Sequence, residues 1–423
     1  MELQTAKGVK DYPPEEKILK NEVVDTLKKV FELYGFAPLE TPIIERYETL
    51  AAKFGAGAGS DVLKETFKLT DQGKRKLALR FELTTSLARF VAMNPNLKMP
   101  FKRYELGPVF RDGPIKSGRV RQFWQCDVDT IGVSSMLADA ELLAIADAVF
   151  KKLKIDSVMK VNNRKLLNGI LEQAGFKKKD DALIAIDKLE KVGKKGVTAE
   201  LKEKGYSEKQ IKDFFSLVKP GIGIEELKDK VRNEEAKKGL EELEELFSYL
   251  KIMKVSSVQF EISLARGLGY YTGTVFEAFA KKGAVSSSLA GGGRWDNMIG
   301  NFMGGGREIP AVGIAFGLVP IMETLTAGKE LKKKTLTQVY VIPINTVEQS
   351  LKVVQELREE GVPCDFSTKK GVSKNLEYAN SLGIPYVVII GEKELKEKKV
   401  LLRDMESGQE SLLSVKDVVK KVR

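Results

Sequence analysis

Apolar residues at helical spacing mark two segments in the first half of the chain. Between Ile18 and Tyr34 they recur every three or four positions, after a Pro-Pro pair and before Gly35. This period places them on one face of a helix, and proline before a helix and glycine after it are common boundary signals. Residues 137–153 have the same period. We therefore expect two amphipathic helices, each with one buried face.

Alternating apolar and polar residues predict strands in the same region. Residues 258–264 alternate in the way that is typical of a strand with one solvent-exposed face. Two runs on either side of a DQGKR turn predict a hairpin. These two runs are residues 66–70 and 76–83. Further strand-like runs occupy residues 270–280 and 311–316, and two more lie within 101–131. Strands that return through short hairpins predict an antiparallel sheet.

The stretch from about Gly175 to Leu250 is rich in Lys and Glu and has helical periodicity with almost no strand pattern. Ser207 and Gln210 have the spacing of a capping box, in which each side chain accepts a hydrogen bond from the backbone N–H of the other residue. We interpret the stretch as a helical insertion within the sheet domain. A separate helical domain is the alternative.

After Leu325 a polar linker leads into alternating strands and helices. The strand patterns VYVIPI, PCDFST and YVVIIG are separated by the helical patterns VEQSLKVVQELREEG and KNLEYANSLG, and a hairpin and a last helix follow. Strands that alternate with helices predict a small α/β domain of the βαβ type.

Length and composition narrow the possible chemistry. A chain of 423 residues is long enough for two or three domains. It has no histidine and two cysteines, Cys126 and Cys364, which excludes Ser-His-Asp and Cys-His catalysis, His-ligated metals, four-cysteine zinc sites and a disulfide framework. Its chemistry must use carboxylates, Arg, Lys, hydroxyls, backbone amides or a magnesium ion. The net charge of +11 suits an anionic partner but also fits an ordinary soluble protein.

The N-terminal residues show no secretory signal, and no apolar run of about 20 residues that could cross a membrane occurs. We expect a cytoplasmic protein with no membrane contact and with both thiols reduced.

Three segments contain candidate ligand-binding residues. The loop between the two runs of 101–131 carries four arginines and one lysine, and clustered guanidinium groups suit phosphate binding; a solvated basic hairpin is the alternative. These residues are Arg103, Arg111, Lys116, Arg119 and Arg121. In LARGLGYYTGTVFEA, a lone Arg266 among glycines precedes Tyr270 and Tyr271, which fits a ligand site or aromatic residues packed beside a turn. The glycine triplets of AGGGRWDNMIGNFMGGG allow close approach of the backbone to a ligand, and GAGAGS at 55–60 suits a flexible lid.

These segments, in this order, resemble motifs of the histidyl-tRNA synthetases, which are class II aminoacyl-tRNA synthetases. ETPIIERYETL resembles class II motif 1, YELGPVFRDGPIKSGRVRQFWQCDVDTIG resembles motif 2, and AVGIAFGL resembles the start of motif 3. LARGLGYYTGTVFEA and GGGRWDNMIG resemble the two histidine-specific motifs of the family. The C-terminal α/β domain resembles the family's anticodon-binding domain. The resemblance covers nearly the whole chain.

The resemblance implies an α+β class II synthetase catalytic domain, with a mostly antiparallel sheet flanked by helices, over residues 1–327. It also implies a helical insertion at about 175–250 and an anticodon-binding α/β domain over 335–423. The implied activity is histidine–tRNA ligase. L-histidine reacts with ATP, which binds with Mg²⁺, to give histidyl-adenylate and pyrophosphate, and histidine is then transferred to tRNA(His). Because motif 1 forms a dimer interface in this class, a homodimer is implied.

The resemblance also assigns roles to individual residues. Arg111 and Arg266 would stabilise charge on the α-phosphate, and Arg266 would also bind the substrate carboxylate. Arg119 would bind the distal phosphates, and Lys116 would contact tRNA. The histidine-binding residues would be Glu82, Thr84 and Gln125 at the α-amino group, Asp129 and Tyr271 at the two ring nitrogens, and Tyr270 beside them.

Several positions depart from the family pattern. Pro320 stands where motif 3 often has an arginine that packs against adenine, so Arg307 or another residue would have to substitute. Gly269 replaces an aspartate, and Asn163 and Trp124 stand where some relatives carry histidine. Two alternatives therefore stay open. One is a non-catalytic paralogue that acts as a regulatory subunit of ATP phosphoribosyltransferase, and the other is a general RNA-binding module.

Overall fold

The structure, a computed structural model, describes residues 3–52, 61–115, 120–219, 221–265, 270–282, 287–305, 307–327, 331 and 333–423. Internal contacts divide the chain into two compact units. The first comprises Met1–Lys10 and Val23–Ala327, and the second comprises Asp11–Glu22 and Gly328–Arg423. None of the helices in the described ranges has the length and apolar character that crossing a membrane requires.

A large, mostly antiparallel sheet forms the centre of the first unit. Within the described residues it has eight strands in the order β1-β5-β6-β11-β10-β9-β7-β8, and the β1–β5 and β7–β8 pairs are parallel. The strands are β1 (Ala37–Pro38), β5 (Phe101–Phe110), β6 (Gln122–Ile131), β7 (Ser157–Asn163), β8 (Val258–Phe260), β9 (Thr274–Ala280), β10 (Ala290–Arg294) and β11 (Ala311–Gly317). This arrangement confirms the predicted α+β class.

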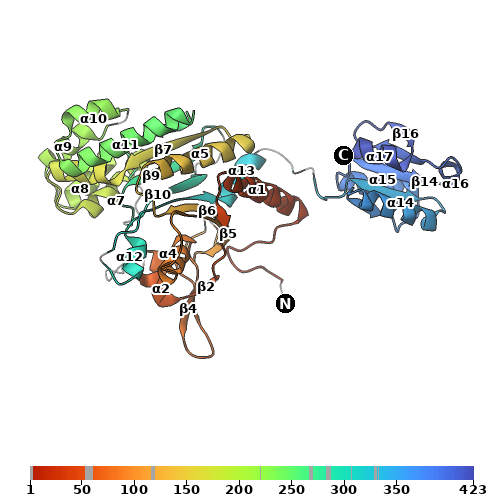
Figure 1. Cartoon of the computed structure of the whole chain (residues 1–423), viewed down its shortest axis with the longest axis horizontal. Helices are drawn as coiled ribbons and strands as arrows, with labels where there is room; N and C mark the ends of the chain where they lie inside the picture. Colours follow the sequence, from red (N-terminus) through yellow and green to blue (C-terminus); the bar gives the residue numbers. More distant parts are fainter. Residues whose placement is uncertain are drawn as a thin grey trace. The chain divides into compact units, whose positions relative to one another are not determined.

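The predicted hairpin belongs to a smaller antiparallel sheet of order β2-β4-β3, made of β2 (Ile44–Arg46), β3 (Lys68–Thr70) and β4 (Lys76–Leu79). In Figure 1 the hairpin extends away from the large sheet. The helices of the sheet region are α1 (Pro14–Leu33), α2 (Tyr47–Ala52), α3 (Asp61–Lys64), α4 (Thr84–Met93), α5 (Leu137–Lys152), α12 (Met298–Phe302) and α13 (Leu318–Thr326).

Helices α1 and α5 lie against one face of the large sheet (Figure 1). The ring of Phe31 from α1 lies 5.7 Å from those of Tyr104 on β5 and Phe316 on β11. Phe150 from α5 also packs on Phe316, at 5.8 Å. Gly35, with a φ of +78°, ends α1 as its sequence position predicts. These contacts fix which face of β5 and β11 points to the helices.

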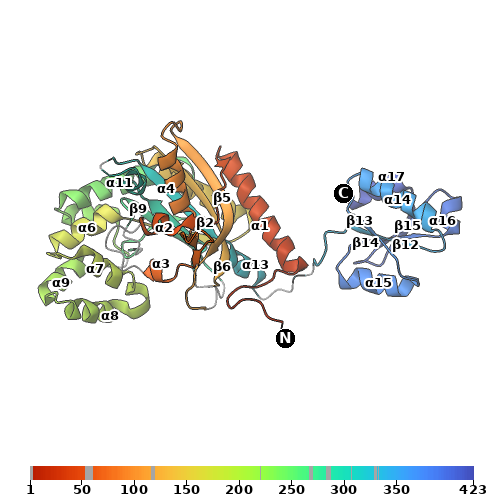
Figure 2. The same cartoon turned by 90° about the horizontal axis from the view of Figure 1, so that it is seen from below.

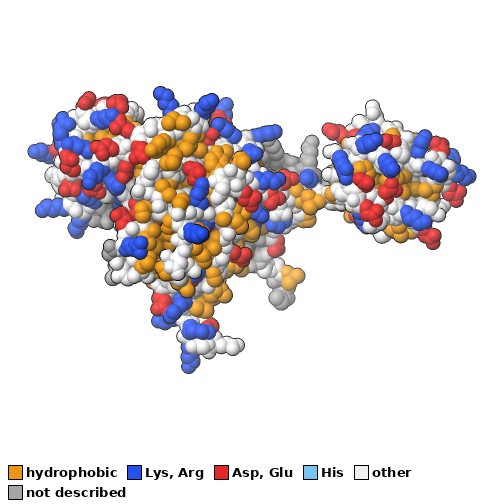
Figure 3. All heavy atoms as spheres, viewed as in Figure 1, with side chains coloured by type: hydrophobic (Ala, Val, Ile, Leu, Met, Phe, Trp, Pro, Cys, Tyr) orange, Lys and Arg blue, Asp and Glu red, His pale blue; other side chains and the backbone are white. Residues whose placement is uncertain are grey.

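The predicted insertion is helical throughout its described part (Figure 2). Its helices, with the one that leads into it, are α6 (Arg164–Gln173), α7 (Lys179–Ile186), α8 (Leu189–Glu203), α9 (Glu208–Leu217), α10 (Ile224–Lys230) and α11 (Glu234–Ile252). The capping box of Ser207 and Gln210 is present at the start of α9. Figure 3 shows basic and acidic side chains interspersed over the insertion, and many of them pair, as Lys219 and Lys230 do with Glu226.

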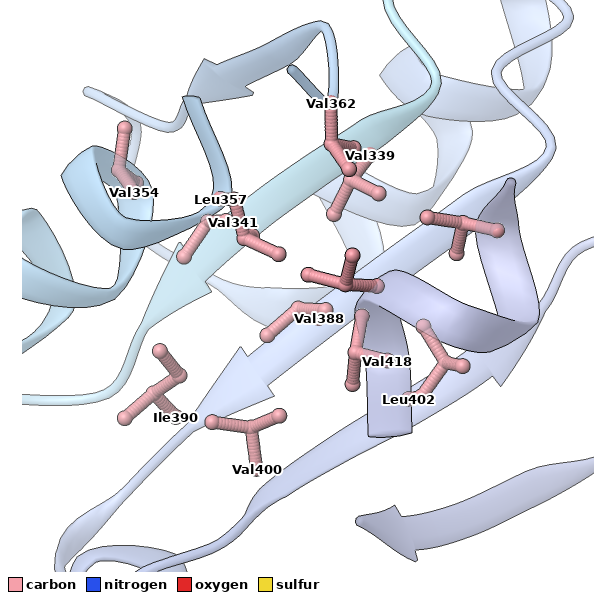
Figure 4. Close-up of a cluster of buried hydrophobic side chains, with 12 residues drawn as sticks. Val339, Val341, Val354, Leu357, Val362, Val388, Ile390, Val400, Leu402 and Val418 are labelled. Carbon is pink, nitrogen blue, oxygen red and sulfur yellow. The ribbon is translucent and has the colours of Figure 1, made fainter. Parts of the chain in front are cut away.

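The second unit contains the predicted βαβ arrangement. Its sheet has the order β13-β12-β14-β15-β16, in which β13, β12 and β14 are parallel. Its elements are β12 (Val339–Pro343), α14 (Val347–Glu359), β13 (Cys364–Phe366), α15 (Val372–Ser381), β14 (Tyr386–Ile390), α16 (Glu392–Lys396), β15 (Val400–Asp404), β16 (Glu410–Leu413) and α17 (Val415–Val422). Valine and leucine side chains from α14, α17 and the strands form its core (Figure 4).

Some predicted elements differ from the structure. The strand expected at 258–264 ends at Phe260, because the side chain of Asn162 binds the carbonyl oxygens of Ile262 and Leu264 and holds a turn there. The strand expected at 270–280 begins at Thr274. The short helix α16 was not predicted.

Candidate active site

Charged and amide side chains lie together on one face of the large sheet where β5 and β6 pair. Side chains two residues apart on a strand share a face. The face opposite α1 and α5 therefore carries three cross-strand pairs, and it is called the site face below. These pairs are Arg103–Asp129, Glu105–Asp127 and Gly107–Gln125.

Two paired glycines make a floor without side chains on the site face. A Cβ at Gly313 of β11 would lie 1.9 Å from Oδ1 of Asp129, and a Cβ at Gly293 of β10 would lie 2.9 Å from the ring of Tyr271. Gly293 and Gly313 are direct cross-strand partners, and neighbouring strands lie about 4.8 Å apart. Asp129 and Tyr271 therefore lie over adjacent positions of the floor.

A cluster of buried ionisable groups adjoins the glycine floor, and each side chain is at most 9% exposed. The cluster consists of Arg80, Glu82, Arg103, Glu105, Asp127 and Asp129. Arg80 donates from Nη1 to Glu105 Oε1 and to the Thr41 carbonyl, both at 2.8 Å. Thr41 also donates to the same carboxylate oxygen through its N–H and its hydroxyl. Arg80 and Thr41 thus hold one side of Glu105.

The guanidinium group of Arg103 lies between two carboxylates. Its Nη2 is 3.0 Å from Asp129 Oδ2, and its Nη1 is 3.8 Å from Glu105 Oε2. None of its three nitrogens has hydrogen-bond geometry to another group within the described part of the chain. Arg103 is fully buried, so it belongs neither to a phosphate-binding loop nor to a solvated hairpin, the two roles expected from the sequence.

The two carboxyl groups of β6 have altered acidity. Burial raises the pKa of Asp129 to about 6, and the charge of Arg103 opposes this rise. Burial also raises the pKa of Asp127 well above its usual range, again opposed by Arg103. Because Asp129 has the shorter approach to a guanidinium, it is the carboxyl that ionises first. Asp129, with a guanidinium nitrogen at 3.0 Å and a pKa of about 6, therefore presents a carboxylate beside the glycine floor at neutral pH.

Glu82 and Thr84 lie at the start of α4. The Glu82 carboxylate accepts hydrogen bonds from the N–H groups of Thr84 at 2.6 Å and Thr85 at 2.9 Å, and from the Thr85 hydroxyl. It therefore caps the helix, whose N-terminus favours negative charge. Gln125 is the third residue that the resemblance assigns to the α-amino group. Its Oε1 is buried and has no hydrogen-bond partner among the described residues. Buried amide oxygens are usually hydrogen-bonded, so this atom suits a donor from a ligand.

Arg111 lies at the end of the site face, just after β5. Its guanidinium carbon is 4.4 Å from the ring centroid of Phe81 and 5.0 Å from that of Phe123. Its Nε donates to the Phe81 carbonyl at 3.3 Å. Two aromatic rings and one hydrogen bond thus orient a half-buried cation, which suits the binding of a planar or tetrahedral anion.

Tyr270 and Tyr271 lie just before β9. Their ring centroids are 4.5 Å apart and their hydroxyl oxygens 3.3 Å apart. Tyr271 is buried among apolar side chains from α4, α12 and β9, whereas Tyr270 is partly exposed. The two hydroxyls therefore lie together at the edge of the floor that Asp129 adjoins.

The remainder of the glycine-rich segment has a structural role. Arg294, which follows the floor glycine, pairs with Asp139 of α5 and donates to the Val133 carbonyl at 2.8 Å. Asp296 accepts hydrogen bonds from the Thr272 hydroxyl and the Ala311 N–H, both at 2.9 Å. These bonds tie β10 to α5 and β11, so they hold the floor in place.

Sequence reasoning did not assign several residues that shape the site. Arg80, Glu105 and Asp127 were not singled out, and Asn162, which is fully buried, holds the turn before Arg266. A signal for the strand residues was present, because charged residues alternate with buried apolar ones along both β5 and β6. Arg80 and Asn162 gave no comparable pattern.

The remaining predicted positions lie either outside the described residues or near α13 and β11. Arg266, Arg119, Lys116, Gly269 and the 55–60 lid lie outside the described residues. Pro320 is buried near the start of α13, against Gly317, and Arg307 is exposed before β11. The expectation that Arg307 substitutes for the motif 3 arginine at adenine stays a prediction.

Family models match most of both compact units of the chain. Residues 8–321 match the family described as "Histidyl-tRNA synthetase", and residues 338–423 match "Anticodon binding domain". The chain is 44% identical to "Histidine--tRNA ligase 1" of Bacillus cereus, over 99% of this chain and 97% of that protein. It is 37% identical to "Histidine--tRNA ligase" of Clostridium tetani, over 98% and 97%.

A crystal structure of histidyl-tRNA synthetase from a Nostoc species is similar, with a TM-score of 0.88 and 31% identity, over 100% of this chain and 99% of that one. Because the family match spans most of the chain and its relatives share nearly its full length, the chain belongs to the histidyl-tRNA synthetase family.

Proposed function

We propose that this chain is a histidine–tRNA ligase that activates L-histidine with ATP and transfers it to tRNA(His). The proposal depends above all on one observation, the placement of Asp129 and Tyr271 over paired glycines. Family membership and the chemistry of the site face support the same activity.

The substrate ring explains why a carboxylate and a phenol lie at adjacent positions. A neutral imidazole has one N–H donor and one bare nitrogen acceptor. In the proposal Asp129 accepts from the N–H and the Tyr271 hydroxyl donates to the other nitrogen. An amino acid without this pattern would leave buried polar groups unpaired, which gives strong discrimination. Glu82, Thr84 and Gln125 would bind the α-ammonium group.

The first reaction needs no general base, because the attacking histidine carboxylate is already ionised. Its oxygen attacks the α-phosphorus of ATP, the bond to the bridging oxygen breaks, and pyrophosphate leaves. Catalysis is then positioning and charge stabilisation. Arg111, which the rings of Phe81 and Phe123 orient, would hold the α-phosphate. Arg266 would bind it from the other side, and Arg119 would bind the distal phosphates.

Magnesium would enter with the nucleotide. The described residues contain no group of three or more Cys, Asp and Glu side chains placed to hold a metal ion. Mg²⁺ is commonly bound through substrate phosphates, and it would neutralise charge on them.

In the second reaction the 3′-terminal hydroxyl of tRNA attacks the activated carbonyl carbon, and AMP leaves. Lys116 would contact the tRNA near this end, and the domain over 335–423 would bind the anticodon. The catalytic domain would occupy 1–327. A homodimer formed through motif 1 and a cytoplasmic location complete the proposal.

The regulatory-subunit alternative has less support. A structure titled as an ATP phosphoribosyltransferase regulatory subunit/histidyl-tRNA synthetase from Bacillus halodurans is 22% identical, with a TM-score of 0.75, and this likeness concerns the fold alone. The curated relatives at 43–44% identity are named as ligases.

The test is histidine-dependent exchange of labelled pyrophosphate into ATP, followed by charging of tRNA(His). Exchange with histidine and with no other amino acid is expected, and Arg266→Ala should abolish it. A folded protein that exchanges with no amino acid would contradict the proposal and favour the regulatory role.

A further inference from the structure

Arg103 has no function in the activity described so far, although it is fully buried beside the proposed histidine site. Its position is unusual because buried guanidinium groups normally make several hydrogen bonds. Here Nε, Nη1 and Nη2 have none to the described residues, and the group instead lies between the carboxylates of Asp129 and Glu105. Its main interaction is therefore electrostatic.

The two carboxylates are not equivalent for Arg103. Glu105 is already held at Oε1 by Arg80 and Thr41, and its Oε2 is 3.8 Å from Arg103. Asp129 approaches to 3.0 Å, and Oδ2 of Asp129 has no hydrogen bond within the described part of the chain. Arg80 therefore neutralises the charge of Glu105, and Arg103 is the cation that neutralises the charge of Asp129.

We propose that Arg103 is a positioning residue for histidine recognition, which keeps Asp129 ionised and oriented over the glycine floor. The proposal rests on the assigned role of Asp129 in binding the substrate ring. Arg103 does not touch substrate. It acts through Asp129 from β5, which lies on the opposite side of β6 from the floor glycine of β11.

The charges around Asp129 show why a cation is needed there. Glu105 faces it from β5 and Asp127 from β6, and Glu82 faces it from the start of α4. Gly313 of β11 contributes no charge. Without Arg103, these carboxyls and burial together would favour a protonated Asp129. A protonated carboxyl loses one acceptor, so the substrate N–H would be bound less well.

The key test is pyrophosphate exchange by Arg103→Gln as a function of pH. An opposite charge at this distance typically lowers a carboxyl pKa by about 1–3 units, so its loss should move the acid limb of kcat/KM for histidine upward by at least one pH unit. We expect the KM for histidine at pH 7 to rise about tenfold or more, with partial recovery at pH 8.5 and little change in the KM for ATP.

Two variants separate this role from a loss of folding. Arg103→Lys keeps the charge but not the shape, so it should restore the pH profile of the wild type while the KM stays raised. Arg294→Gln removes another buried arginine from a carboxylate, that of Asp139 on α5, on the opposite face of the sheet from Asp129. It should lower the melting temperature without moving the acid limb. If Arg103→Gln does not fold, the pH profile of Arg103→Lys decides alone. An acid limb of Arg103→Lys that lies one pH unit or more above that of the wild type would then contradict the proposal.

Failure of this inference is distinguishable from failure of the proposed function. If Asp129→Asn leaves the KM for histidine unchanged, Asp129 has no role at the ring and both ideas about this face are wrong. The other outcome is that Asp129→Asn raises the KM for histidine strongly, whereas Arg103→Gln has the same KM and the same acid limb as the wild type. In that case the ligase proposal stands and Arg103 is only structural.

Discussion

Tyr270 and Tyr271 are neighbours in sequence and in space, yet the structure distinguishes them. Tyr271 is buried over Gly293, whereas Tyr270 is partly exposed. A buried hydroxyl that donates to a substrate nitrogen contributes more to substrate binding than a partly exposed one that donates to a neighbouring side chain, as Tyr270 does to Tyr271.

Removing each hydroxyl tests this distinction. For Tyr271→Phe we expect the KM for histidine to rise about 10- to 100-fold, the effect of leaving one buried polar atom of the ligand unpaired. Tyr270→Phe, the matched control, should change it less than about threefold, because its hydroxyl is nearer to solvent. Steady-state pyrophosphate exchange measures both. Equal effects of the two substitutions would contradict the assignment of Tyr271 to the ring.

Asp127 should make the protein less stable as the pH rises. Burial raises its pKa well above the unfolded value, so the folded protein binds more protons than the unfolded chain between these two values, and stability falls with increasing pH. Asn has nearly the same shape and cannot ionise. We expect the melting temperature of Asp127→Asn, relative to wild type, to increase between pH 6 and pH 8.5. Thermal unfolding at both pH values measures this, and a constant difference would show that Asp127 is not the titrating group.

At the scale of elements, strands β10 and β11 owe their function to the absence of side chains where they pair. In a Gly313→Ala variant the new Cβ would lie 1.9 Å from Oδ1 of Asp129 and would therefore displace that carboxylate. We expect histidine-dependent exchange to fall by about 100-fold or more, as misplacement of a binding group by about 1 Å can cost this much.

A second glycine controls for the change in composition. Gly223, before α10, has a negative φ, and no atom lies within 4 Å of the position that a Cβ would take. Gly223→Ala should retain wild-type exchange. Wild-type exchange by Gly313→Ala as well would mean that the floor tolerates a side chain and that Asp129 is placed differently.

The elements that sequence predicted well are those whose signal is local. The capping box of α9 and the glycine after α1 depend on residues within a few positions. By contrast, β8 ends early because Asn162, about 100 residues away, donates to the carbonyl oxygens of Ile262 and Leu264 just after it. Arg103 is buried in β5, outside the basic loop, because Asp129 lies opposite it on another strand. These outcomes depend on pairing across the sheet, which a single sequence pattern does not contain.

At the scale of the whole molecule, charge should separate the two reactions. The chain has a net charge of +11, and tRNA is a polyanion whose binding releases counterions. Histidine, in contrast, would bind to a buried set of groups that salt screens little. We therefore expect the KM for tRNA in charging to rise steeply between about 50 and 200 mM salt, whereas histidine-dependent exchange changes less than about twofold. Parallel salt dependence of both reactions would contradict this separation.

The paired glycines also limit how the specificity of this protein could be redesigned. Glycine has no side chain to truncate, so no substitution in the floor can deepen the pocket, and a substitution there can only fill it. Room for a bulkier analogue of histidine must be made at the sides, where Asp129 and Tyr271 supply the selectivity. Widening the substrate range toward larger synthetic amino acids would therefore weaken discrimination in the same step, whereas narrowing it toward smaller ones could leave both side residues intact.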